Sequence, residues 1–108
     1  MQGDQLRGHL EALVLAVLAD GPAHGYGIIG RLRDRSDGAF DLAEGTVYPA
    51  LHRLEATGRI TAEWCEVQRR RRKMYSVTTS GSRELSLQRV RWTEFSESIT
   101  RVLGGATS

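Results

Sequence analysis

The residues best suited to chemistry lie in one stretch, residues 44–60, where one side of a predicted helix carries donors and no carboxylate. At 100° per residue, four apolar residues share a sector and predict a buried stripe: Val47, Ala50, Leu51 and Leu54. The opposite sector contains Gly45, Tyr48, Pro49, His52, Arg53 and Ala56. Gly58 is suited to end the helix. Such a face suits insertion into a DNA major groove, and the alternative is a half-buried surface helix that happens to carry His and Arg.

The length and composition describe one small globular domain. A chain of 108 residues can build a single core, and 40% hydrophobic and 26% charged residues are ordinary values. Its single cysteine, Cys65, excludes an internal disulfide and fits a reducing cytosol. The longest apolar run, residues 12–19, is too short to span a bilayer, and residues 1–4 lack the features of a signal peptide. We therefore expect a cytoplasmic protein with no membrane partner.

Positive charge is concentrated after residue 68. Residues 1–68 carry six arginines and ten acidic residues, whereas residues 69–108 carry nine basic and three acidic residues. Five of those nine cations are consecutive: Arg69, Arg70, Arg71, Arg72 and Lys73. A basic block on an otherwise balanced domain indicates a polyanionic partner, and the alternative is a solvated loop.

The apolar periodicity predicts three helices before this block. A first helix is expected over residues 5–19 with Asp4 as its N-cap, a second from about residue 25 to the turn at Asp37, and a third over about residues 44–57. The three glycines of the second helix lower its intrinsic stability, so tertiary packing must hold it.

After residue 60 the spacing of apolar residues changes from the helical period of 3.6 to the strand period of two, which predicts a β-hairpin. Ile60, Ala62 and Trp64 point one way, and Tyr75 and Val77 share a face on the second strand. The basic run lies at the connection and predicts a cationic tip. Three helices and a cationic hairpin are the order of a winged helix-turn-helix, in which phosphate binding is favoured.

A last helix is expected over residues 79–103, with Thr78 as its N-cap. Six residues at 3-4-3-4-3 spacing predict a coiled-coil seam: Leu85, Gln88, Trp92, Phe95, Ile99 and Val102. A rod of about 37 Å has little to pack on in a domain this small, so we expect it to form a homodimer. The alternative is a helix folded back on its own core. The predicted fold is mainly α with a small β-hairpin: a winged helix-turn-helix over residues 1–78 and a dimerisation helix over residues 79–108, in one compact unit.

Five segments resemble the successive signatures of PadR-family transcriptional regulators, over nearly the whole chain. They are residues 24–28, 44–55, 58–60, 71–75 and 77–81, with Gly-Thr-Val-Tyr-Pro and Arg-Leu-Glu as the most specific parts. The resemblance implies a homodimer, a palindromic operator in double-stranded DNA, and repression relieved by a small molecule. The single C-terminal helix resembles the family's short-armed branch, in which a tryptophan in the position of Trp92 lies in a ligand pore between subunits.

These observations assign candidate residues. The expected DNA-binding residues are Tyr26, Thr46, Tyr48, Pro49, His52, Arg53, Arg69, Arg70, Arg71, Arg72 and Lys73. Thr46 and Tyr48 are expected to bind phosphates, and His52 and Arg53 to lie at base edges. Trp92 and Phe95 are expected to bind a planar aromatic effector across the dimer axis.

Three positions differ from the family pattern or from simple rules. Ala43 replaces the usual capping residue of the third helix, at a cost of about 1 kcal/mol. Gln68 and additional arginines replace the usual glycines of the hairpin, which predicts a stiffer tip that favours phosphate contact over base reading. Pro49 breaks helices by rule, and only the resemblance indicates that the helix continues through it.

The sequence argues against an enzyme. It has no paired acid and base on one element, no phosphate loop and no metal-ligand cluster, and no Cys or second His lies at ligand spacing from His24. We therefore expect no catalytic residue, metal or cofactor. The main alternative is a winged-helix protein–protein adaptor without specific DNA binding. An RNA-binding role is disfavoured, because the aromatic residues are few and expected to be buried.

Overall fold

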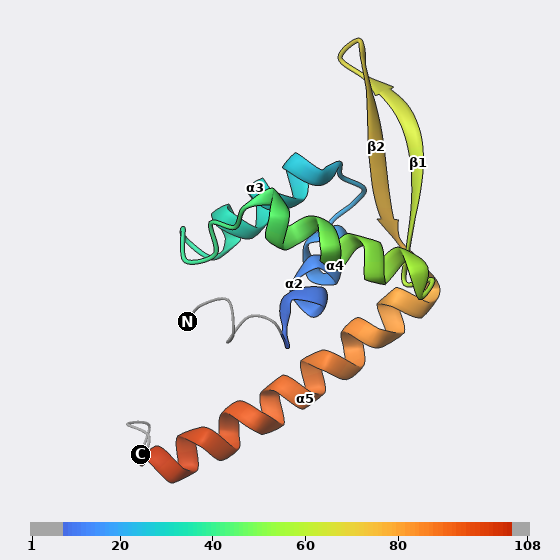
Figure 1. Ribbon diagram of the computed structural model, residues 1–108. Helices are drawn as coiled ribbons and strands as arrows, with labels where there is room; N and C mark the ends of the chain where they lie inside the picture. Colours follow the sequence, from blue (N-terminus) through green and yellow to red (C-terminus); the bar gives the residue numbers. More distant parts are fainter. Residues whose placement is uncertain (1–7, 105–108) are drawn as a thin grey trace.

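The computed structural model describes residues 8–104. Within this range the elements are α2 (Leu10–Leu18), α3 (Gly25–Arg35), α4 (Glu44–Ala56), β1 (Ile60–Val67), β2 (Arg70–Val77) and α5 (Thr79–Leu103). Three short helices pack together, and the hairpin and α5 extend from them in different directions (Figure 1). The predicted mainly helical fold with one hairpin is confirmed. The expected N-cap Asp4 and residues 5–7 lie outside the described residues. The expected helix is wrong at Gly8 and His9, which form a turn, because α2 begins at Leu10 with His9 in its N-cap position.

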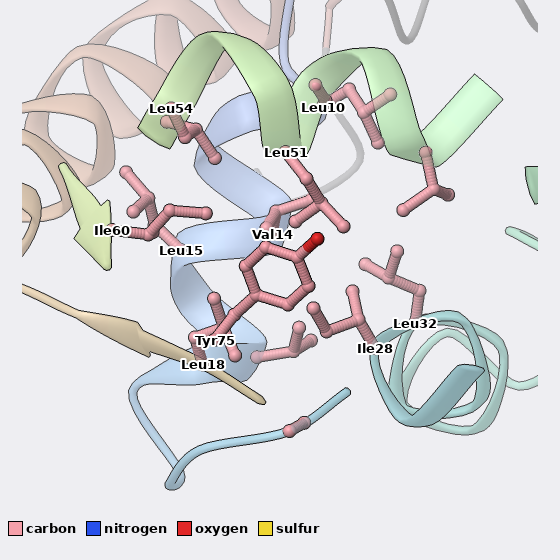
Figure 2. Close-up of a cluster of buried hydrophobic side chains, with 14 of the residues drawn as sticks. Leu10, Val14, Leu15, Leu18, Ile28, Leu32, Leu51, Leu54, Ile60 and Tyr75 are labelled. Carbon is pink, nitrogen blue, oxygen red and sulfur yellow. The ribbon is translucent and has the colours of Figure 1, made fainter. Parts of the chain in front are cut away.

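The core forms where α2 crosses α3, α4 and the base of the hairpin (Figure 2). The predicted stripe on α4 is confirmed, because Val47, Ala50, Leu51 and Leu54 are all buried. Their partners are Leu10, Val14, Leu15, Val17 and Leu18 of α2, Ile28 and Leu32 of α3, Ile60 and Tyr75 of the hairpin, and Leu85 of α5. The sequence therefore directs one apolar side of each element inward and leaves the other side of α4 exposed.

Local signals set both ends of α4. Ala43 occupies the N-cap position without a side-chain cap, as predicted. The helix continues through Pro49. At its end, Gly58 adopts a left-handed φ of 76°, and the amide of Arg59 donates to the carbonyl of Leu54 at 2.9 Å. This is a Schellman cap, and it confirms the predicted role of Gly58.

The hairpin register corrects the position of the cations. Val67 pairs with Arg70, so only Gln68 and Arg69 form the turn. Both have positive φ, 53° and 68°, as a type I′ turn requires. The sequence pattern puts the whole basic run at the connection, but Arg70, Arg71, Arg72 and Lys73 form the first half of β2 instead. A two-residue turn is the shortest common hairpin connection, so the rest of the run remains available to the strand.

The helix α5 has buried residues only near its start. Thr78 caps it by accepting from the amide of Gly81 at 3.0 Å, as predicted. Gly81 and Leu85 are buried, whereas Trp92, Phe95, Ile99 and Val102 are exposed. The alternative of a helix folded on its own core is therefore wrong for the second half of α5 (Figure 1). Within residues 8–104, none of the helices is long and apolar enough to cross a bilayer.

The junction between α4 and α5 is tightly bonded. The Thr78 amide donates to the Arg59 carbonyl at 3.1 Å, and the Thr78 hydroxyl donates to the Gly58 carbonyl at 2.7 Å. A Cβ on Gly81 would collide with the Arg59 carbonyl, so only glycine fits there. Arg59 Nη2 also lies 3.5 Å from Glu84 Oε1 on the next turn of α5.

Candidate nucleic-acid interface

The outward face of α4 is exposed along its length. Thr46, Pro49, His52 and Arg53 are all exposed, whereas Tyr48 is half-buried. The hydroxyl of Tyr48 lies against Gly25, so closely that a Cβ on Gly25 would collide with it. Tyr48 therefore packs α4 against the start of α3 and has less freedom to reach a phosphate than Thr46.

The start of α3 lies beside the start of α4. The ring of His24 caps α3 by accepting the amide of Gly27 at Nδ1, at 3.1 Å. The exposed Tyr26 follows on the first turn. The Glu44 carboxylate, as a hydrogen-bond acceptor and a negative charge, raises the pKa of Tyr26, and the positive charge of Arg72 partly offsets this increase. Tyr26 thus lies close to the start of α4. Among the described residues, no group of three or more His, Cys, Asp or Glu side chains could hold a metal ion, at His24 or elsewhere.

Arg53 has a partner that the sequence reasoning missed. Its Nε donates to Glu11 Oε2 of α2 at 2.7 Å, and both side chains remain partly exposed. The two residues are 42 positions apart, so no local pattern could pair them. An exposed ion pair of this kind contributes about 0.2–1 kcal/mol. The bond uses Nε alone, which leaves the Nη side of the guanidinium as the part that can meet a base or a phosphate.

The cations of the hairpin divide between its two faces. Successive side chains of a strand alternate, so Arg71 and Lys73 share the face of Trp64 while Arg70 and Arg72 share the face of Cys65. Lys73 Nζ lies 3.5 Å from Glu55 Oε1 of α4 and 5.6 Å from the centre of the Tyr75 ring. Burial, and secondarily the charge of Glu55, raise the pKa of Tyr75.

The aromatic residues are more exposed than expected. Trp64 on β1 is 59% exposed, and Tyr26, Trp92 and Phe95 are also more than half exposed. The expectation that they are buried is wrong, because the hairpin and α5 extend beyond the core. Periodicity correctly assigned Trp64 to a face, but it carries no information on where the covering elements end.

Trp92 and Phe95 lie together on α5, with ring centres 5.8 Å apart. The ring of His9, before α2, meets Trp92 edge-on at 5.1 Å. These residues line an apolar groove of about 1010 Å³ between α2 and α5. The groove also includes Leu13, Ala16 and Phe40, which the sequence reasoning missed. Leu13 and Ala16 are apolar at i, i+3 spacing beside the core stripe of α2, a signal that was present in the sequence.

Known proteins resemble this chain in sequence and architecture. Residues 14–87 match the model of the transcriptional regulator PadR-like family. The transcriptional regulator Rv3488 of Mycobacterium tuberculosis is 35% identical over 92 residues, covering 85% of this chain and 80% of its own. A transcriptional regulator from Clostridium thermocellum superposes with a TM-score of 0.83 and 28% identity, covering 91% of this chain and 93% of its own. Bacillus subtilis PadR in complex with operator DNA has a TM-score of 0.64 and 28% identity, covering 72% of this chain and 45% of its own.

Proposed function

This chain belongs to the PadR-like family of transcriptional regulators, and from that premise we propose that it acts in the cytoplasm as a homodimeric repressor relieved by a small molecule. The family is one of DNA-binding regulators rather than enzymes. The observation that carries the proposal is the exposed face of α4, whose own residues Thr46, Pro49, His52 and Arg53 include no carboxylate, beside a cationic hairpin. That combination matches the groove-reading and phosphate-binding parts of a DNA-binding domain.

In this proposal the two parts of the surface have different tasks. Tyr26, Thr46 and Tyr48 contact phosphates near the start of α4, and Pro49 lies close to the DNA. His52 and the Nη side of Arg53 approach base edges in the major groove. Hairpin cations neutralise phosphates and supply affinity independent of sequence: Arg69, Arg70, Arg71, Arg72 and Lys73. Lys73 contributes least, because Glu55 already neutralises part of its charge.

A second copy of this chain is the proposed cover for α5. The exposed residues Trp92, Phe95, Ile99 and Val102 form one apolar side of the helix, and the groove beside α2 remains open. A coiled-coil seam is complementary to itself, so twofold pairing buries both copies at once. In this arrangement residues 1–78 bind DNA and residues 79–108 hold the dimer. The two α4 helices then lie about 34–36 Å apart, one turn of DNA.

The proposed effector is a planar aromatic molecule bound between Trp92 and Phe95 of both copies. The ring of His9, just before α2, meets Trp92 of α5 edge-on. The groove therefore has an aromatic ring on each of its two sides. Offset stacking on an indole adds about 0.5–1.5 kcal/mol beyond area burial. Relief of repression requires that the molecule bind one spacing of the α4 helices better than the other.

Nuclease protection by the purified protein tests the proposal. We expect a protected segment with two inverted half-sites in the region upstream of its own gene, and affinity that falls steeply with salt. Equal protection of unrelated DNA, or binding that salt leaves unchanged, would instead favour the protein–protein adaptor.

A further inference from the structure

The hairpin carries a tryptophan outside the hydrophobic core. Trp64 continues the face of β1 that begins with the buried Ile60, yet 59% of its surface is exposed. It lies on a charged part of the hairpin, with Lys73 directly opposite on β2. A large apolar ring gains stability when it is covered, so an exposed indole among cations indicates a surface that contacts a ligand.

Arg71 stacks on this ring. Its guanidinium carbon lies 5.0 Å from the centre of the Trp64 ring. Trp64 pairs with Lys73 and Glu66 pairs with Arg71, so Arg71 is the diagonal neighbour of Trp64 on the same face. Stacking restrains a long side chain that otherwise samples many rotamers, while the N–H donors at the edge of the guanidinium remain available.

The two cations of this face differ in their partners. Lys73 lies close to Glu55 of α4. The ion pairs among residues 8–104 do not include Arg71, although Glu66 is opposite it in the register. Arg71 also lies nearer the turn, on the part of the hairpin that extends beyond the helices (Figure 1). Its charge is therefore held in place by an aromatic ring and is free to meet an anionic partner.

We propose that Trp64 and Arg71 form a DNA-contact site of their own, in which the indole positions the guanidinium for insertion into the minor groove beside the segment that α4 faces. This inference rests on the proposed DNA-binding function. A narrow minor groove has an enhanced negative potential that attracts arginine, and A·T tracts have the narrowest grooves. The site therefore favours A·T base pairs outside the major-groove motif. Trp64 is a positioning residue, because it acts through Arg71.

The test compares variants in a binding-site selection with randomised flanks on both sides of the motif. We expect the parent to select A·T pairs in the flank, with a preference on the order of tenfold over G·C pairs. Trp64→Ala and Arg71→Lys should both lose that preference and keep the central motif. Both variants keep the positive charge, so the slope of log affinity against log salt should not change. Arg91→Lys, at an exposed position of α5 outside the proposed DNA-contact surface, is the matched control and should select the parental flank.

Tryptophan emission gives a second measurement. Addition of duplex DNA should change the emission of the parent, and Trp64→Phe should remove the part of that change that comes from the hairpin. Parental flank preference in both Trp64→Ala and Arg71→Lys would overturn the inference, as would a parent without any flank preference. A parent that selects no motif at all would overturn the proposed function instead.

Discussion

At the scale of single residues, the ion pair of Arg53 separates two roles for the same side chain. The guanidinium gives its Nε to Glu11 of α2, so it ties α4 to α2. The same residue is proposed to reach a base edge with its Nη side. One role contributes to folding and the other to sequence preference, and the two are measured by different experiments.

Arg53→Ala should relax base preference at one position of each half-site. A bidentate Arg–guanine contact is worth about 1–3 kcal/mol of discrimination. Glu11→Gln is the matched control, because it weakens the ion pair and keeps Arg53. It should lower the free energy of unfolding by less than about 1 kcal/mol and leave the selected motif unchanged. If Arg53→Ala also returns the parental motif, and both variants lose the same stability, Arg53 serves only to hold α2 and α4 together.

At the scale of elements, the hairpin turn stores strain. Gln68 and Arg69 both have positive φ, where residues with a Cβ are disfavoured and Asn-Gly is preferred. The double variant Gln68→Asn, Arg69→Gly should therefore raise the free energy of unfolding by about 1 kcal/mol, measured by urea denaturation. Gln68→Val is the opposite control and should lower it, because β-branched residues tolerate positive φ poorly. An unchanged midpoint of urea denaturation in both variants would mean that the turn is free of strain.

Three of the hairpin cations, Arg69, Arg70 and Arg72, should act on all DNA alike. When Arg69, Arg70 and Arg72 are changed together to Gln, we expect the affinities for operator DNA and for unrelated DNA to fall to the same degree. The slope of log affinity against log salt should become shallower by about 0.9 for each phosphate that the variant no longer neutralises. A control with Arg83, Arg91 and Arg101 changed to Gln removes the same charge from exposed positions of α5. Equal slopes in the two triple variants would mean that net charge, rather than the hairpin, sets the salt dependence.

The sequence predicts elements better than tertiary interactions for a physical reason. The stripe on α4, the cap at Gly58 and the cap at Thr78 depend on residues within one or two turns, so spacing identifies them. The interactions of Arg53 with Glu11 and of Tyr48 with Gly25 join distant segments and require the fold itself. The sequence also did not predict that Arg70 to Lys73 form part of a strand. Arginine runs have no strong strand preference, so the pairing with β1 determines where β2 begins.

At the scale of the whole molecule, the apolar side of α5 should determine assembly. Ile99→Glu puts a charge in the proposed seam, so we expect a monomer in sedimentation and weaker operator binding. Thr100→Glu adds the same charge about 100° further around the helix, outside the seam, and this variant should remain a dimer. A dimeric Ile99→Glu protein would move the interface elsewhere, for example onto α2.

The groove at Trp92 should bind planar cationic dyes. Binding should quench tryptophan emission in the parent and lower its operator affinity, since the dye must favour one arrangement of the dimer. Trp92→Leu keeps an apolar residue in the seam, so we expect it to remain dimeric and to bind operator regardless of dye. Equal dye affinity in the two proteins would exclude Trp92 from the site.

The hydrogen-bonded junction between α4 and α5 should make the two helices move together. The hydrogen bonds of Thr78 and the close approach of Gly81 to the Arg59 carbonyl join the start of α5 to the end of α4. A tilt of about 5° along a rod of about 37 Å displaces its end by about 3 Å. In the proposed dimer, a change in the angle at which the two α5 helices cross should therefore move α4 as well, so an effector bound between the helices could alter the spacing of the two α4 helices.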